Sequence, residues 1–245
     1  MARLRRAGLL APRSMEAAIA REFQRIKRPI LATLTREAAP GRGSQASFNR
    51  LMVTSAHPGD GKTFTSMNLA LSLAAELDHS VLLVDGDVIK PGISRALGLN
   101  DRPGLMELLA DEQRVPEDFI VATDIPHLSV LPAGRRDGQS AERLSSRRME
   151  GLAKELSSDP SRIVVFDSSP LLATAESQAL ALNMGQIVMV VRAGRTERRA
   201  VDAALSLIEP SNAEISLVLN QSRKGFGDDY DGYYGVYQTE GNPHA

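Results

Sequence analysis

The chain has 245 residues, of which 42% are hydrophobic and 24% are charged. This composition is that of a globular protein with one sizeable core, and the formal net charge of −1 disfavours a strongly basic protein that binds nucleic acid. Because the chain contains no cysteine, disulfides, Cys-ligated zinc, iron–sulfur clusters and a cysteine nucleophile are excluded.

Three segments precede the main domain. Residues 1–14 are predicted to be a flexible basic leader, since their apolar run is too short for the core of a signal peptide. A helix is expected over residues 15–34, kinked or ended by Pro29, and the Gly-, Ser- and charge-rich residues 35–49 are expected to be a linker. No apolar run approaches the roughly 18 residues of a membrane span. We therefore expect a cytoplasmic protein whose membrane association depends on a partner or on the leader.

Residues 50–221 alternate short apolar runs with helical patterns. Apolar runs separated by helices predict an α/β fold, with a doubly wound, mostly parallel sheet that carries helices on both faces. Such a sheet places its ligand beyond the carboxyl ends of its strands. The expected strands are residues 50–56, 80–85, 127–134, 162–169, 186–194 and 214–220, and the expected helices are residues 62–77, 93–97, 142–156, 176–182 and 197–208.

A phosphate-binding loop is indicated by the sequence SAHPGDGKT at residues 55–63, between the first expected strand and the first helix after it. The Walker A pattern is G-x-x-x-x-G-K-[ST]; here Ala56 takes the first glycine position and the other positions match. Glycine lets backbone N–H groups turn toward one phosphate, the lysine reaches the β and γ oxygens, and the threonine hydroxyl can ligate magnesium. An accidental GKT in a glycine turn is the alternative, but the strand–loop–helix context favours nucleotide binding. The residues expected at the nucleotide are Pro58, Gly59, Asp60, Gly61, Lys62, Thr63 and Phe64.

Aspartates end two of the expected strands. VLLVDGD contains Asp85 and Asp87, and RIVVFDSSP contains Asp167. Carboxylates at this edge can hold magnesium or accept a proton from an attacking hydroxyl, although each can instead cap the helix that follows. Asn220, at the end of the last strand, is either an adenine contact or a turn residue. The expected catalytic residues are Lys62, Asp85, Asp87 and Asp167, and the expected Mg²⁺ ligands are Thr63, Asp85 and Asp167.

These motifs resemble those of the bacterial tyrosine kinases of capsule and exopolysaccharide synthesis, a branch of the P-loop ATPases with a deviant Walker A motif. The resemblance covers roughly residues 15–237. SAHPGDGKT is similar to the Walker A of that class, VLLVDGDVIKP to its Walker A′ and RIVVFDSSPLLA to its Walker B. EFQRIKRP and FDSSPLLATAE are especially similar to the subgroup associated with exosortase-type systems.

Three positions depart from the pattern of the class. Ala56 replaces the first Walker A glycine, which the kinases tolerate, and Ile89 stands where many members have an arginine, which puts one basic contact in doubt. Partition ATPases of the same class carry a signature lysine early in the loop, where this chain has His57. The residue at 57 favours the kinase branch over an ATP-sandwich dimer.

A charged triplet and a tyrosine cluster extend the resemblance. Glu22, Arg25 and Arg28 form E-x-x-R-x-x-R within a helical arc of about 120°. In the kinases this pattern mediates ring assembly, whereas by itself it is a solvated charged face. The Gly- and Asp-rich residues 222–245 are expected to be a flexible tail whose tyrosines, in the kinases, are phosphorylated by a neighbouring subunit; an aromatic patch that docks on the domain or on a partner is the alternative. All four tyrosines lie there: Tyr230, Tyr233, Tyr234 and Tyr237.

The resemblance implies a tyrosine autokinase that uses ATP and Mg²⁺, phosphorylates its tail in trans and regulates exopolysaccharide polymerisation or export. It implies a homo-oligomeric ring, a transmembrane chain-length-determinant or adaptor protein, a tyrosine phosphatase, and a place at the inner face of the cell membrane. Asp87 is expected to orient or deprotonate the tyrosine hydroxyl, although its role and that of Asp85 can be exchanged. Two other functions stay open, a partition-type positioning ATPase and a non-catalytic ATP-binding regulatory subunit. His57 and the tail disfavour the first, and the intact GKT and Asp motifs disfavour the second.

Overall fold

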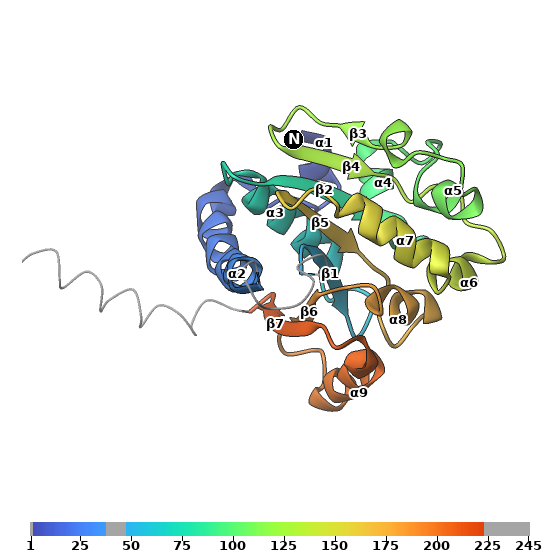
Figure 1. The fold of residues 1–245 in the computed structure, drawn as a ribbon. Helices are drawn as coiled ribbons and strands as arrows, with labels where there is room; N and C mark the ends of the chain where they lie inside the picture. Colours follow the sequence, from blue (N-terminus) through green and yellow to red (C-terminus); the bar gives the residue numbers. More distant parts are fainter. Residues whose placement is uncertain (1, 38–47, 223–245) are drawn as a thin grey trace, which may run out of the picture.

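The computed structural model describes residues 2–37 and 48–222, which form one β-sheet between two layers of helices (Figure 1). The strands are β1 (Arg50–Ser55), β2 (Ser80–Asp85), β3 (Val121–Ala122), β4 (Leu128–Leu131), β5 (Arg162–Asp167), β6 (Gln186–Arg192) and β7 (Glu214–Asn220). The α-helices are α1 (Ala2–Arg6), α2 (Glu16–Glu37), α3 (Lys62–Ala74), α4 (Gly92–Leu97), α5 (Leu105–Ala110), α6 (Ser140–Leu144), α7 (Arg147–Leu156), α8 (Ala175–Ala181) and α9 (Arg198–Ile208).

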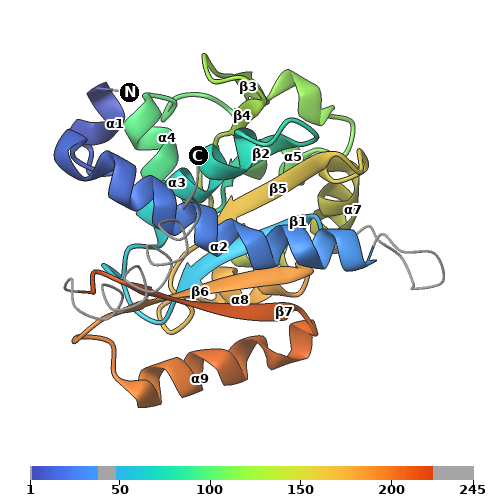
Figure 2. The same ribbon diagram turned by 90° about the vertical axis from the view of Figure 1, so that its left-hand side faces the viewer.

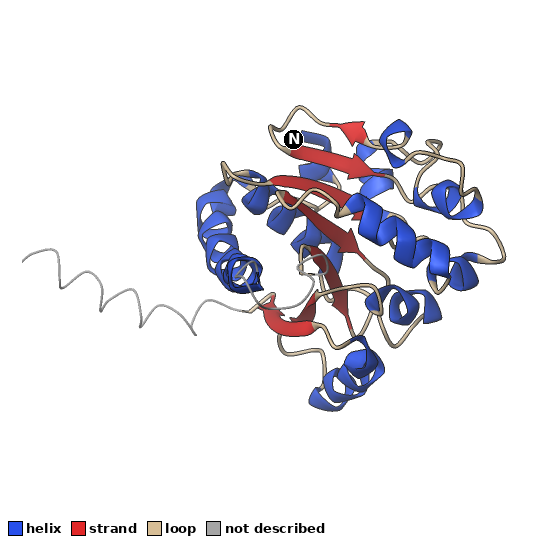
Figure 3. Ribbon diagram, in the orientation of Figure 1, coloured by secondary structure: helices blue, strands red, loops and turns tan. Residues whose placement is uncertain are grey.

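The sheet has the strand order β3-β4-β2-β5-β1-β6-β7, and every neighbouring pair is parallel except β3 with β4 (Figure 3). The central strand β1 is buried along its whole length and β5 at every residue after Arg162, which is why both are apolar on both faces. The predicted α/β fold with a mostly parallel sheet is therefore confirmed. The carboxyl ends of β1, β2 and β5 lie side by side, since Asp85 pairs in register with Asp167 and Val53 pairs with Asp167.

Two apolar cores lie on opposite faces of the sheet, beneath the two helix layers that Figure 2 shows. One core contains side chains of α1, α2, α3 and α4, and the other contains side chains of α5, α6, α7, α8 and α9. Phe166 is the largest fully buried side chain. The helices on both sides leave the carboxyl edge of the central strands as the place where polar side chains gather.

The prediction of a free leader over residues 1–14 is wrong. Ala2–Arg6 is helical, and Leu4, Leu9 and Leu10 are buried in the core that includes α2, α3 and α4. The side chain of Asn68 on α3 donates to the Leu9 carbonyl at 2.9 Å. The leucines of this basic segment thus pack in the core on one face of the sheet, and the segment is attached to the domain.

Other helices differ from the sequence prediction in detail. Pro29 lies inside α2 and does not end it, because Phe23 and Ile30 on either side of the proline are both buried in the core that includes α3. The single helix expected over 142–156 is two helices: Ser146 caps α7 by accepting from the Met149 N–H, which starts a new helix after α6. Helix α5 and the short antiparallel strand β3 were not predicted, and α3 ends at Ala74 rather than near 77.

Some sequence predictions fall on residues 38–47 and 223–245, which lie outside the described residues; they include most of the expected linker and the tyrosine cluster. In the part of the chain that the structure describes, no helix has both the length and the apolar character needed to cross a membrane.

Candidate active site

The phosphate loop connects β1 to α3, as its motif predicts, and two glycines shape it. Gly59 and Gly61 have φ of 86° and 103°, in the region that favours glycine. A Cβ on Gly61 would also lie 2.0 Å from Nδ2 of Asn220, so another residue here would displace that side chain from the loop as well as strain the backbone. The N-terminal turn of α3 begins directly after Gly61 and leaves its backbone N–H groups available to an anion.

Asp60 and Asn220 hold the loop in place. The Asp60 carboxylate is buried and accepts hydrogen bonds from the His57 N–H at 3.1 Å and from Oγ1 of Thr196 at 2.8 Å. Nδ2 of Asn220 donates to the Asp60 carbonyl at 2.9 Å, and its Oδ1 accepts from the Gln221 N–H. Both residues therefore tie the loop to the elements around β6 and β7. The adenine contact expected of Asn220 stays a prediction.

Three buried aspartates lie at the carboxyl ends of β2 and β5, and a serine holds each of them. Oδ2 of Asp85 accepts from both the N–H and Oγ of Ser94 at 2.7 Å. The other two aspartates follow the same pattern. Asp87 accepts a hydrogen bond from Oγ of Ser169 at 2.9 Å, and Asp167 accepts one from Oγ of Ser66 at 2.9 Å. A neighbouring hydroxyl thus binds one oxygen of each carboxylate and fixes the orientation of the group.

Two carboxylate oxygens in this cluster have no hydrogen-bond partner among the described residues: Oδ1 of Asp85 and Oδ2 of Asp167. The pKa of Asp85 is raised to about 7, mainly by burial and to a smaller extent by repulsion from Asp167. Burial also raises the pKa of Asp167 to about 6, although the charge of Lys62 and the hydrogen bond from Ser66 oppose the rise. Two buried carboxyls side by side with open oxygens form a site that attracts a cation.

Mg²⁺ fits this donor set. Thr63, Asp85 and Asp167 are hard oxygen donors, and magnesium at nucleotide sites is held by one or two carboxylates together with waters and phosphate oxygens. The described residues contain no group of three or more His, Cys, Asp or Glu side chains arranged as a metal centre of their own. An ion held by these donors would take waters and phosphate oxygens as its remaining ligands.

Lys62 is held by an ion pair. Its Nζ lies 3.0 Å from Oδ2 of Asp87, and both side chains are largely buried. Asp87 also accepts from the Lys90 N–H at 3.0 Å. The lysine expected at the phosphates and the aspartate expected at the acceptor hydroxyl thus neutralise each other in this structure.

The remaining predicted residues occupy different surroundings. Pro58 lies exposed in the loop, whereas the ring of Phe64 packs against Phe23 of α2 with centroids 6.2 Å apart. Phe64 belongs to the first turn of α3, directly after the loop. The triplet on α2 is exposed, and Arg25 forms an ion pair with Glu22 at 3.3 Å. The four tyrosines lie outside the described residues.

Sequence reasoning missed the residues that orient the site. They are Ser66, Ser94, Ser169 and Thr196, whose hydroxyls bind the aspartates of the loop and the strand ends. Ser169 follows Asp167 in the FDSSP segment, so its place next to the site was visible in the motif. Ser66, Ser94 and Thr196 belong to no motif that indicates their role, because the aspartates that they bind lie far away in the sequence or across a loop of irregular length.

The amino-acid sequence has relatives among bacterial kinases. It is 34% identical over 187 residues to "Tyrosine-protein kinase YwqD" of Bacillus subtilis, which covers 76% of this chain and 77% of that protein. It is 29% identical to "Tyrosine-protein kinase ptk" of Acinetobacter johnsonii and 32% identical to "Succinoglycan biosynthesis transport protein ExoP" of Rhizobium meliloti. The chain spans only 24% and 25% of the length of these last two proteins. A scan against models of known protein families finds no match.

Solved structures share the fold. The chimerical protein CapA2B2 has a TM-score of 0.70 at 27% identity, covering 87% of each chain. The VpsO kinase domain has a TM-score of 0.68 at 29% identity, covering 86% of this chain and 100% of that one. A Borrelia burgdorferi plasmid partition protein bound to AMPPNP has a TM-score of 0.58 at 18% identity, over 78% of this chain and 82% of that one, and shows likeness of fold alone.

Proposed function

This chain belongs to the bacterial tyrosine-protein kinases, and we propose that it is an autokinase that transfers the γ-phosphoryl group of Mg·ATP to tyrosines of its own C-terminal tail on a neighbouring copy. The observation that carries the proposal is the convergence of the phosphate loop, Lys62 and three buried aspartates at one edge of the sheet. One relative named for succinoglycan biosynthesis and transport supports a role in exopolysaccharide synthesis or export.

Phosphate binding is expected to release the Lys62–Asp87 pair. The β and γ phosphates of a nucleotide in the loop would compete with Asp87 for the lysine Nζ, which lies 3.0 Å from Oδ2 of that aspartate. Once the lysine has moved to the phosphates, Oδ2 of Asp87 is free to accept a hydrogen bond from a tyrosine hydroxyl. Nucleotide binding therefore breaks the ion pair, and Asp87 becomes available as a proton acceptor only when a nucleotide is bound.

Asp87 is suited to receive the proton late in the reaction. A phenol has a pKa of about 10, so a carboxylate does not ionise it in the ground state. In a loose transition state the phenol becomes more acidic as the bond to phosphorus forms, and its proton then passes to Oδ2 of Asp87. Ser169 and the Lys90 N–H keep Oδ1 of the same carboxylate occupied, which leaves the other oxygen for the substrate.

Asp85, Asp167 and Thr63 would hold Mg²⁺, whose charge neutralises the phosphate oxygens when it is bound. Ser94 keeps Oδ2 of Asp85 engaged, so the unpartnered Oδ1 is the oxygen left for the ion or for one of its waters. Ser66 does the same for Asp167, where Oδ2 is left. These serines make the two carboxylates donors of fixed direction.

Phosphoryl transfer in trans requires contact between copies of the chain. We assign the exposed Glu22, Arg25 and Arg28 of α2 to that contact and regard a transmembrane adaptor and a phosphatase as the partners that regulate it. Lys27, on the opposite side of the helix, is buried and donates to the Ser72 carbonyl at 2.9 Å. The triplet therefore faces outward from a helix that is fixed to the domain.

A mixing experiment tests both transfer and direction. The acceptor is Lys62→Met, which has an intact tail and no phosphate-binding lysine, and the donor is a variant with all four tail tyrosines changed to Phe. We expect phosphotyrosine on the acceptor tail, measured by mass spectrometry, only when donor and Mg·ATP are both present. Each variant alone serves as the control.

Other outcomes point to the other two functions. Phosphate release from ATP by the wild-type protein without any phosphotyrosine would indicate a positioning ATPase. Nucleotide binding with neither hydrolysis nor phosphotyrosine would indicate a regulatory subunit. Phosphotyrosine that forms in the wild type but never on the acceptor in the mixture would contradict transfer in trans.

A further inference from the structure

The outer edge of β7 is open and apolar. This strand is the last in the sheet order, and its only sheet neighbour within the described residues is β6. Ile215, Leu217 and Leu219 are 37%, 58% and 60% exposed, and they alternate along the strand, so they share one face. An uncovered apolar edge strand is a template for pairing with another extended segment.

The same three residues also present unpaired backbone groups. The Glu214 N–H donates to the Gly185 carbonyl and the Asn220 carbonyl accepts from the Ala193 N–H, so residues 214, 216, 218 and 220 face β6. Successive residues of a strand point their N–H and C=O to opposite sides. Residues 215, 217 and 219 therefore direct both groups to the open edge, where a further strand can bind them.

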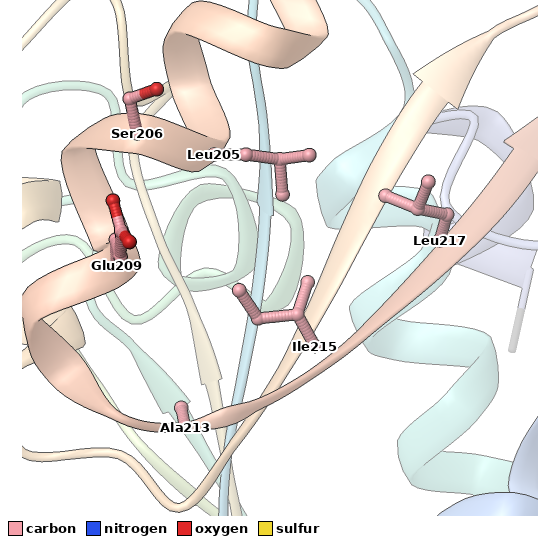
Figure 4. A pocket seen from close by; sticks show the side chains of 6 residues that line it. All are labelled: Leu205, Ser206, Glu209, Ala213, Ile215 and Leu217. Carbon is pink, nitrogen blue, oxygen red and sulfur yellow. The ribbon is translucent and has the colours of Figure 1, made fainter.

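A hollow of about 530 Å³ lies beside this edge, between β7 and α9. Figure 4 shows Leu205 of α9 pointing toward Ile215 and Leu217 of β7. Helix α9 covers the apolar face of β7 only in part, so a side chain of aromatic size can be accommodated against these groups.

Two positively charged side chains lie at one end of the same surface. Arg198 and Arg199 begin α9 and have side chains that are 95% and 85% exposed. Each arginine has an acidic neighbour, since Arg198 lies 3.9 Å from Asp202 and Arg199 forms an ion pair with Glu197, but both pairs lie on the surface, where water screens them. Weak surface pairs leave both guanidinium groups able to attract an acidic segment that runs past this end of the helix.

We infer that residues 223–245 of the same chain dock along this edge as an additional strand that runs antiparallel to β7. The segment is separated from Asn220, the last residue of β7, by two residues, and it contains all four tyrosines of the chain. The segment begins with Arg223 and Lys224, and the residues 226–240 that follow contain Asp228, Asp229, Asp231 and Glu240 and no lysine or arginine. A chain that turns back from the end of β7 passes the arginines of α9 first and the apolar side chains of β7 afterwards.

Tethering favours this occupant over a free one. A segment joined to the strand by a few residues has an effective concentration on the order of millimolar at the edge, which a partner or a second copy does not reach unaided. Its rings meet leucine and isoleucine side chains across the strand pair, which is a favourable combination in sheets. While docked, the tail keeps its tyrosines on its own subunit and away from a neighbouring site.

Tyrosine fluorescence reports on the tail alone, because the chain has no tryptophan and no tyrosine outside residues 230–237. The experiment measures acrylamide quenching of this fluorescence in dephosphorylated full-length protein without nucleotide, with a synthetic peptide of residues 223–245 as the reference. We expect the quenching constant of the protein to be lower than that of the peptide by about twofold, since docked rings lose about half of their contact with water. Because no ATP is present, the result does not depend on the proposed kinase activity.

Matched variants locate the shielding. Leu217→Lys places a charge on the edge and should raise the quenching constant to that of the peptide. Leu77→Lys is the control, because Leu77 is 88% exposed and lies between α3 and β2, four strands away from β7. Changing Arg198 and Arg199 to Ala should produce part of the rise, as should high salt.

Hydrogen exchange on the wild-type chain gives an answer that needs no variant. Docking predicts that the N–H groups of residues 215, 217 and 219 exchange slowly, whereas an open edge predicts rapid exchange. Equal quenching of protein and peptide, or rapid exchange at these three amides, would overturn the inference. Shielding that disappears on dilution would also overturn it, because the occupant would then be a second copy.

Discussion

Replacing Asp85 by Asn should stabilise the nucleotide-free protein. Burial and the neighbouring Asp167 raise the pKa of Asp85 from 3.8 to about 7. Such a rise corresponds to about 4 kcal/mol of lost stability once the carboxyl is ionised, because each pH unit of difference is worth about 1.4 kcal/mol. Local relaxation around buried charges reduces the penalty, so we expect a gain of about 1–2 kcal/mol at pH 7 or above.

The amide also has suitable partners. Asn retains an oxygen for the two Ser94 donors, and its N–H groups replace the unpartnered Oδ1 beside Asp167, the register neighbour across β2 and β5. For a chain of this size, 1–2 kcal/mol raises the thermal midpoint by about 3–6 °C. The assay is thermal unfolding followed by circular dichroism, without nucleotide.

The pH dependence has a definite sign. Between about pH 4 and pH 7 the folded wild type keeps a proton on Asp85 that the unfolded chain has released, so wild-type stability falls as pH rises through this range. The advantage of Asp85→Asn should therefore grow from pH 5 to pH 7 and stay constant at higher pH. With Mg·ATP the order should reverse, because the variant loses an ion ligand.

Asp87→Asn is the matched control. Asp87 is the same residue type at the same edge, but Lys62, the Lys90 N–H and Ser169 all donate to it. Removing its charge leaves the lysine without a counter-ion, at a cost of about 1–3 kcal/mol. A midpoint for Asp85→Asn equal to or below the wild type at pH 7, or a gain of equal size at pH 5 and pH 8, would refute the reasoning.

Four further outcomes are expected. Lys62→Met should abolish tail phosphorylation while the protein stays folded and loses about 1 kcal/mol with its ion pair; phosphotyrosine in this variant by mass spectrometry would contradict the assignment of the loop. Changing Glu22, Arg25 and Arg28 together to Ala should shift sedimentation toward smaller species, and an unchanged profile would leave the triplet a solvated face. Mg²⁺-dependent nucleotide binding, followed by calorimetry, should tighten from pH 6 to pH 8 with release of protons, because the carboxyls at the strand ends have raised pKa values. Full phosphorylation adds a charge of about −6 to −8 to the tail, so Mg·ATP should disperse wild-type assemblies in light scattering but not those of a variant with all four tyrosines changed to Phe.

The central part of the fold could be predicted because its signals are local. The strands that lie inside the sheet are continuous apolar runs, and the glycines and lysine of the loop recur at fixed spacing, so both could be found without tertiary information. The positions of Asp85 and Asp167 followed from the rule that parallel strands end at one edge.

What could not be predicted depends on contacts between distant parts of the chain. Ser66 and Asp167 are 101 residues apart in sequence, and nothing near either residue indicates the other. The burial of Leu4 and Leu9 was missed because five helical residues are too few to show a helical period. The ion pair between Lys62 and Asp87 joins two residues that were assigned separate roles, and only the packing of the loop against β2 brings them together.

The bond between Asn220 and the phosphate loop fixes the point from which the tail departs. Asn220 donates to the Asp60 carbonyl, so the root of the tail is anchored at the rim of its own nucleotide site. A fully extended chain advances at most about 3.6 Å per residue, which places Tyr230 within about 36 Å of Asn220 and Tyr237 within about 61 Å. Any assembly that permits transfer between copies must therefore bring a neighbour's phosphate loop inside this radius, and the tyrosine nearest the chain end has the longest reach.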